Sequence, residues 1–159
     1  KLIVGLLVVA FLSLNAGAAS AQSVDVWMPH TSDTTGASVM IPIYVSDVTG
    51  LNIFSYNAKI SFDPTVLTAT GVSITGTLTE PWGNPTVSIA DGEVVIAAAG
   101  TSPPSGSGIL IYVNFDAVGS PCNTSQLTFE EMQFNEGEPA ANTTDGSFHV
   151  TAPSPNYSL

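Results

Sequence analysis

Residues 53–67 read I-F-S-Y-N-A-K-I-S-F-D-P-T-V-L, and this stretch decides the fold class of the chain. Side chains alternate between the two faces of a β-strand, so the run predicts one apolar face and one polar face. The apolar face comprises Phe54, Tyr56, Ala58, Ile60 and Phe62. The polar face comprises Ser55, Asn57, Lys59 and Ser61. This alternation is typical of an antiparallel strand that packs one face on a core, and Asp63-Pro64 predicts the turn that ends it.

Further apolar runs occur on both sides of this stretch, separated by segments rich in Gly, Pro, Ser and Asn. They predict strands at residues 23–27, 38–48, 67–75, 86–90, 93–99, 109–118, 126–134 and 146–152. Residues 29–37 and 135–145 are predicted to be loops. Phe134 is out of phase with Leu127 and Phe129, which predicts a bulge. No helical period is evident after residue 21, so about nine strands predict an all-β, antiparallel β-sandwich.

A hairpin is predicted at residues 86–99, because Asp91-Gly92 is a strong signal for a two-residue turn. In its second strand, Ala97 and Ala99 share a face with Val95. That face is small and apolar, where a solvated face would normally be polar.

The first 21 residues have the composition of a secretory signal peptide. Lys1 precedes an unbroken apolar run over residues 2–12, and an A-S-A motif ends the segment. A membrane anchor is the alternative, but the run is well short of the roughly 20 residues that a spanning helix needs. We therefore predict a signal peptide at 1–21, a secreted domain at 22–152 that is extracellular or at the cell surface, and the start of a Pro/Ser linker at 153–159.

The charge of the chain excludes several classes of partner. Without Lys1, Lys59 is the one basic residue against thirteen Asp and Glu, a formal charge of −12. No cluster of cations could neutralise phosphates, so nucleic acid is excluded, and the mature domain is not expected to bind or enter a membrane. His30 and His149 lie outside any catalytic or metal-binding motif. We therefore predict no enzymatic activity, no metal and no cofactor.

Three segments resemble the cohesin domain: S-F-D-P-T-V-L at 61–67, G-S-G-I-L-I-Y-V-N-F-D-A at 106–117 and D-G-S-F-H-V at 145–150. Cohesins are scaffoldin modules of cellulosomes that bind dockerin domains, and similar modules occur in other secreted and surface proteins. The resemblance implies a nine-stranded jelly-roll sandwich. It also implies that one sheet face binds a helix of a dockerin-like partner, that any calcium belongs to the partner, and that contact with polysaccharide is indirect.

The resemblance places partner-binding residues on the outward faces of two strands. The Asn-x-Asp pair of well-known members falls on Ser55 and Asn57, which keep hydrogen-bonding groups but lack the charge. Positions where the family often has larger apolar residues and an acid hold Ala97, Ala99 and Gly100. Such a flat surface would let a helix approach closely. The alternative is that the two alanines merely lie beneath a loop.

The residues leave two other functions open. A carbohydrate-binding module can have the same sandwich architecture, because a fold does not fix a function. It would need exposed aromatic side chains in a row, for which the candidates are Trp27, Tyr44, Trp82 and Tyr112. A purely structural or adhesive module of a surface protein is the other alternative. We predict a secreted, non-catalytic protein–protein interaction module that acts in a polysaccharide-degrading or cell-surface assembly.

Overall fold

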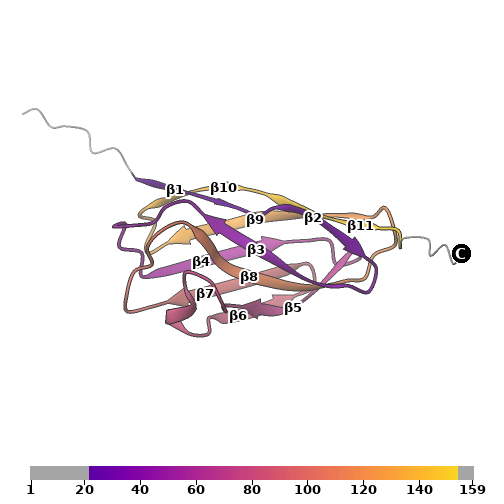
Figure 1. Ribbon diagram of the computed structural model, residues 1–159, viewed down its shortest axis with the longest axis horizontal. Helices are drawn as coiled ribbons and strands as arrows, with labels where there is room; N and C mark the ends of the chain where they lie inside the picture. The colour runs from indigo at the N-terminus through magenta and orange to yellow at the C-terminus, as the bar shows by residue number, and fades with distance from the viewer. Residues whose placement is uncertain (1–21, 154–159) are drawn as a thin grey trace, which may run out of the picture.

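The computed structural model describes residues 22–153, and most of this part of the chain is β-strand (Figure 1). Eleven strands between residues 22 and 153 form two sheets, which confirms the predicted all-β sandwich with jelly-roll topology. Sheet A contains, in spatial order, β10 (Ala140–Thr144), β1 (Ser23–Trp27), β3 (Ser38–Val45), β8 (Gly108–Ala117) and β5 (Leu67–Ser73). Sheet B contains β2 (His30–Thr34), β11 (Gly146–Thr151), β9 (Thr124–Phe134), β4 (Ser55–Ser61), β7 (Glu93–Ala99) and β6 (Thr86–Ala90). One turn of 3₁₀ helix, η1 (Glu80–Trp82), lies between β5 and β6.

Strand β4 lies inside sheet B, with β9 on one side and β7 on the other. Its inward side chains Tyr56, Ala58 and Ile60 are fully buried, as the alternation predicts. They belong to one hydrophobic core to which both sheets contribute large side chains, including Ile41, Ile43, Ile111, Phe115, Phe134 and Phe148. At the end of β4, the Phe62 ring meets the edge of the Phe115 ring, with centroids 5.1 Å apart and planes at 74°. Core packing therefore fixes β4 and turns its polar side chains outwards.

The first two strands run beside the last two and in the same direction (Figure 1). β1 pairs in parallel with β10 in sheet A, and β2 pairs in parallel with β11 in sheet B. Both segments change sheets at the same level, where the Met28 amide donates to the Thr144 carbonyl and the Ser147 amide donates to the Pro29 carbonyl. Gly146 fits this crossing because a Cβ there would lie 2.5 Å from the Pro29 carbonyl oxygen. Two adjacent segments of chain thus join the sheets at this edge.

Two of the eleven strands, β2 and β10, lie in the segments predicted to be loops, residues 29–37 and 135–145. The expected count of about nine strands is therefore low by two. Both strands are short, mostly exposed and at the edge of their sheets. An edge strand that buries few side chains needs no apolar alternation, so the sequence pattern does not mark it. These two strands also make parallel pairings, whereas the other pairings described are antiparallel.

Two local predictions are confirmed. The Asp91-Gly92 turn joins β6 and β7 as a hairpin. The bulge in β9 falls at Glu130, because Lys59 pairs with Glu131 while the next residue of β4 pairs with Phe129. Two consecutive glutamates are thereby placed opposite one position of β4.

The predicted signal peptide, residues 1–21, lies outside the described residues, as do residues 154–159 of the predicted linker. Between residues 22 and 153, no helix is long and apolar enough to cross a membrane.

Candidate functional site

The outer face of sheet B carries four of the five residues expected to bind a partner. In the antiparallel pair formed by β4 and β7, Ser55 lies opposite Ala99 and Asn57 lies opposite Ala97. Residues directly opposite each other share a face, so these four residues form one compact surface, here called the small-residue face. Asn57 and Ala99 are exposed, whereas Ser55 and Ala97 are half-buried.

The small-residue face borders an open depression of about 370 Å³. The segment that leads from η1 to β6 also lines it, through Gly83, Asn84, Pro85 and Thr86. Ala99 remains exposed beside this segment, whereas Ala97 is half-buried where it pairs with Thr86. No sequence signal marks residues 83–86 as part of a site, because only the fold brings this turn next to β7.

Trp82 fixes the position of this segment. Its indole N–H donates to the Ser102 carbonyl oxygen at 2.7 Å, and its ring centroid lies 6.0 Å from that of Tyr56. Gly100 lies against the indole, which occupies the space that a Cβ would need. Gly100 is the fifth expected partner-binding residue, but it is not among the residues that line the depression. In the structure it makes room for Trp82, and its amide donates to the Phe54 carbonyl at 2.9 Å.

Phe54 departs from the predicted strand pattern, since its side chain is 42% exposed rather than buried. β4 begins one residue later, at Ser55, so the alternation does not extend to Phe54. Asn135 holds the backbone here: its side-chain oxygen accepts from the amides of Phe54 (2.8 Å) and Ser55 (3.3 Å). Its side-chain nitrogen donates to the carbonyls of Asn52 (3.2 Å) and Glu138 (2.8 Å). Asn135, which no sequence signal marks, thus fixes the Ser55 end of the small-residue face.

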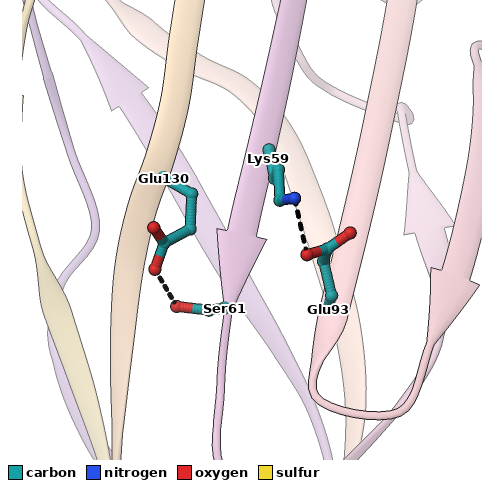
Figure 2. Close-up of polar contacts among 4 residues, drawn as sticks. All are labelled: Lys59, Ser61, Glu93 and Glu130. Atoms are coloured by element: carbon teal, nitrogen blue, oxygen red, sulfur yellow. Dashed lines mark hydrogen bonds and ion pairs between the residues drawn. The ribbon is translucent and has the colours of Figure 1, made fainter.

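The other end of the same sheet face is charged (Figure 2). Lys59 Nζ lies 2.8 Å from Glu93 Oε2, and Ser61 Oγ donates to Glu130 Oε1 at 2.7 Å. The hydrogen bond with Glu93 and its negative charge raise the pKa of Lys59, and the charges of Glu130 and Glu131 add to this shift. With one cation among three carboxylates, this end is negative, whereas the small-residue face is uncharged.

The described histidines form polar contacts away from the depression. His30 Nδ1 lies 2.8 Å from Ser147 Oγ, and His149 Nδ1 lies 3.0 Å from Thr124 Oγ1, all at exposed or half-buried positions. Within residues 22–153, no three side chains of His, Cys, Asp or Glu come together as metal ligands would. The small-residue face itself offers hydrogen bonding and close steric approach.

The aromatic candidates for sugar binding divide between two places. Trp27 and Tyr44 lie opposite each other on the outer face of sheet A, stacked with ring centroids 5.4 Å apart and planes at 18°. Tyr112 lies on the same outer face, opposite Pro42. Trp82 lies apart from them, packed against the core. Three of the four candidates therefore share a face, on the sheet that does not carry the small-residue face.

A β-sandwich that presents an uncharged face of small and hydrogen-bonding side chains has the architecture of a recognition module. The chain belongs to the cohesin domain family, because the family model for the cohesin domain matches residues 24–150. The family resemblance seen in the sequence is thereby confirmed. No curated protein matches the chain in sequence.

Solved cohesin structures have the same fold. The seventh type I cohesin of ScaB from Pseudobacteroides cellulosolvens is 17% identical, with a TM-score of 0.73, covering 87% of this chain and 99% of that one. The cohesin–dockerin complex Coh-OlpC–Doc435 from Clostridium thermocellum gives 22% identity and a TM-score of 0.70, over 85% of this chain and 98% of that one. A non-cellulosomal cohesin from the archaeon Archaeoglobus fulgidus gives 19% identity and a TM-score of 0.66, over 82% and 93%.

Proposed function

We propose that this cohesin domain is a non-catalytic module that binds a helical, dockerin-like partner on the outer face of sheet B. The observation that carries the proposal is that Ser55, Asn57, Ala97 and Ala99 converge on one face beside an open depression. Ser55 and Asn57 supply donors and acceptors, while the alanines leave a flat surface that a helix backbone can approach closely. Similar cohesins that have been solved in complex with dockerins support this class of partner.

The charged end of the face sets a requirement on the partner. Glu93, Glu130 and Glu131 surround Lys59, so a basic side chain of the partner helix is favoured near this end and an acidic one is repelled. Residues 22–153 carry a formal charge of −12, which would attract a basic partner over a longer range. Association with such a partner is therefore expected to be faster at low ionic strength.

We also propose that the domain works outside the cell, in a polysaccharide-degrading or cell-surface assembly. The signal-peptide composition of residues 1–21 supports export. Export with cleavage predicts that the protein secreted from an expression host begins at Gln22, which N-terminal sequencing measures. Secreted protein that retains residues 1–21 would contradict this part of the proposal.

The binding proposal is tested by calorimetry of residues 22–153 with a panel of purified dockerins, including those of the solved complexes. Ala99→Arg places a long side chain on the small-residue face and is expected to weaken binding at least tenfold. Ala140→Arg is the matched control, since Ala140 is an exposed alanine on β10 of the other sheet. Asn57→Ala removes the exposed hydrogen-bonding group and is expected to weaken binding several-fold.

Two results would overturn the proposal. One is the absence of binding to every dockerin of the panel, which a purely structural or adhesive module would give. The other is equal loss of binding in Ala99→Arg and Ala140→Arg, which would place the interface elsewhere.

A further inference from the structure

The outer face of sheet A carries an exposed patch that the proposed partner site does not use. Strand pairing places Trp27 opposite Tyr44 and Pro42 opposite Tyr112. Met40 lies two residues before Pro42 on β3 and faces the same side of the sheet. Trp27 is 37% exposed and Met40 is 53% exposed. Aromatic side chains gathered on an exposed face commonly mark a binding surface rather than a scattered set of surface residues.

The stacking of Trp27 on Tyr44 makes this patch rigid. The two rings lie nearly parallel, at 18°, with centroids 5.4 Å apart. Such a contact holds the indole in one orientation before any ligand arrives, which lowers the entropic cost of binding.

A polar pair lies beside Trp27 on the same face. Asp25 precedes Trp27 by two residues on β1, and its partner across the strands is Asn142 of β10. The Asn142 side-chain nitrogen donates to Asp25 Oδ1 at 3.2 Å, and both side chains are exposed. A carboxylate and a carboxamide side by side supply several acceptors and a donor, which suits neighbouring hydroxyl groups.

Charge narrows the class of ligand. The one cation among the described residues, Lys59, lies on sheet B, so the patch offers no positive group to an anion. A second copy of residues 22–153, with one lysine and thirteen Asp and Glu, carries the same formal charge of −12 and is repelled. The patch therefore suits an uncharged ligand that has apolar ring faces and hydroxyl groups.

We propose that the outer face of sheet A binds a neutral glycan, with a pyranose ring packed on Trp27 and its hydroxyl groups bonded to Asp25 and Asn142. This site lies on the opposite sheet from the proposed partner site and is independent of it. The domain would thus hold a polysaccharide chain on one side and a protein partner on the other.

Affinity electrophoresis of residues 22–153 in gels containing soluble neutral polysaccharides tests this site, using hydroxyethylcellulose, xyloglucan, glucomannan and mixed-linkage β-glucan. At least one of them is expected to retard the native domain. Trp27→Ala is expected to raise the apparent Kd at least tenfold, and Asp25→Ala several-fold. Trp27→Phe keeps an aromatic ring and is expected to retain part of the binding. Partial binding by this variant would show that the loss in Trp27→Ala comes from the missing ring and not from misfolding.

Val118→Ala is the matched control, because it removes an exposed apolar side chain that lies outside the patch. It is expected to leave retardation unchanged, and Ala99→Arg is expected to do the same. The proposal is overturned if no polysaccharide retards the native domain, or if Val118→Ala weakens binding as much as Trp27→Ala. It is also overturned if sedimentation shows a dimer that Trp27→Ala dissociates, since a second copy would then cover the patch.

Discussion

The indole of Trp82 lies directly against Gly100 and fills the space that any side chain at position 100 would occupy. Gly100→Ala therefore forces the indole or the backbone to move, and overpacking of this kind costs about 1–3 kcal/mol. Chemical denaturation is expected to show this loss. Partner binding is expected to weaken too, because Trp82 precedes the segment that lines the depression.

A double-mutant cycle separates steric conflict from a general effect of the added methyl group. In a Trp82→Ala background the space is empty, so Gly100→Ala is expected to cost little there. Equal costs in both backgrounds would show that the Trp82 contact is not the reason for glycine at this position.

Asn135 is predicted to control the order of the backbone at the start of β4. Asn135→Ala removes the acceptor for the Phe54 and Ser55 amides and both side-chain donors. The backbone at position 135 has a positive φ of 46°, which alanine adopts less readily than asparagine. We expect a loss of about 1–3 kcal/mol in the free energy of unfolding and faster hydrogen exchange at the Phe54 amide.

Two variants at the same position serve as controls. Asn135→Asp keeps the acceptor and is expected to preserve protection of the Phe54 amide. Asn135→Gly removes the side-chain bonds but tolerates the positive φ, so it is expected to lose protection with less cost in stability than alanine. Unchanged exchange at Phe54 in both the alanine and the glycine variants would contradict this role.

Tyr56 is predicted to make the domain sensitive to alkaline pH. Burial raises the pKa of its hydroxyl from 10.0 to about 12, while the nearby Thr79 hydroxyl opposes the shift. Between these values the unfolded chain loses the proton and the folded chain keeps it, so stability is complete below pH 10 and falls as the pH rises towards 12. The loss from this one group is about 1.4 kcal/mol by pH 11.

Tyr56→Phe isolates this contribution. The buried Tyr56 hydroxyl has no hydrogen-bond partner among residues 22–153, so its removal is expected to cost little at pH 8. Urea unfolding at pH 8 and pH 11 should show a smaller loss in the variant than in the native domain. Identical losses would show that Tyr56 does not drive the alkaline transition.

Gly146 is predicted to be essential where the terminal strands change sheets. A Cβ there would lie 2.5 Å from the Pro29 carbonyl oxygen and 2.8 Å from the Met28 Cβ. Gly146→Ala is expected to destabilise the domain by about 1–3 kcal/mol or more. Neither obstacle is the mobile tip of a side chain, because one is a backbone oxygen and the other a Cβ atom in the connection between β1 and β2. Ser147→Ala, one residue later and half-buried, is the control and should cost less, as thermal unfolding would show.

The core-forming strands could be predicted from the sequence because burial on one face imposes alternation. Tyr56, Ala58 and Ile60 are buried as that pattern requires, and the Asp91-Gly92 turn follows from local backbone preference. β2 and β10 bury little, so no alternation marks them. Phe54 lies just outside β4, where alternation no longer predicts which side a residue faces.

In the candidate site, too, the residues placed by strand alternation could be predicted from the sequence, whereas those placed by contacts between distant segments could not. Ser55, Asn57, Ala97 and Ala99 could be placed on one face because strand phase and the family resemblance both point there. Residues 83–86 line the depression because Trp82, just before them, packs against Gly100. This contact joins segments that are distant in sequence. The same holds for Asn135, whose bonds reach back more than 80 residues to Phe54 and Asn52.

The parallel course of the terminal strands has a mechanical consequence. The described chain enters at β1 at one end of the long axis and leaves after β11 at the other (Figure 1). Tension between residues 22 and 153 therefore runs along β1–β2 and β10–β11, nearly at right angles to the hydrogen bonds that join them. These bonds are loaded together in shear rather than broken one after another. The same edge that joins the two sheets can thus carry a pulling force through the domain.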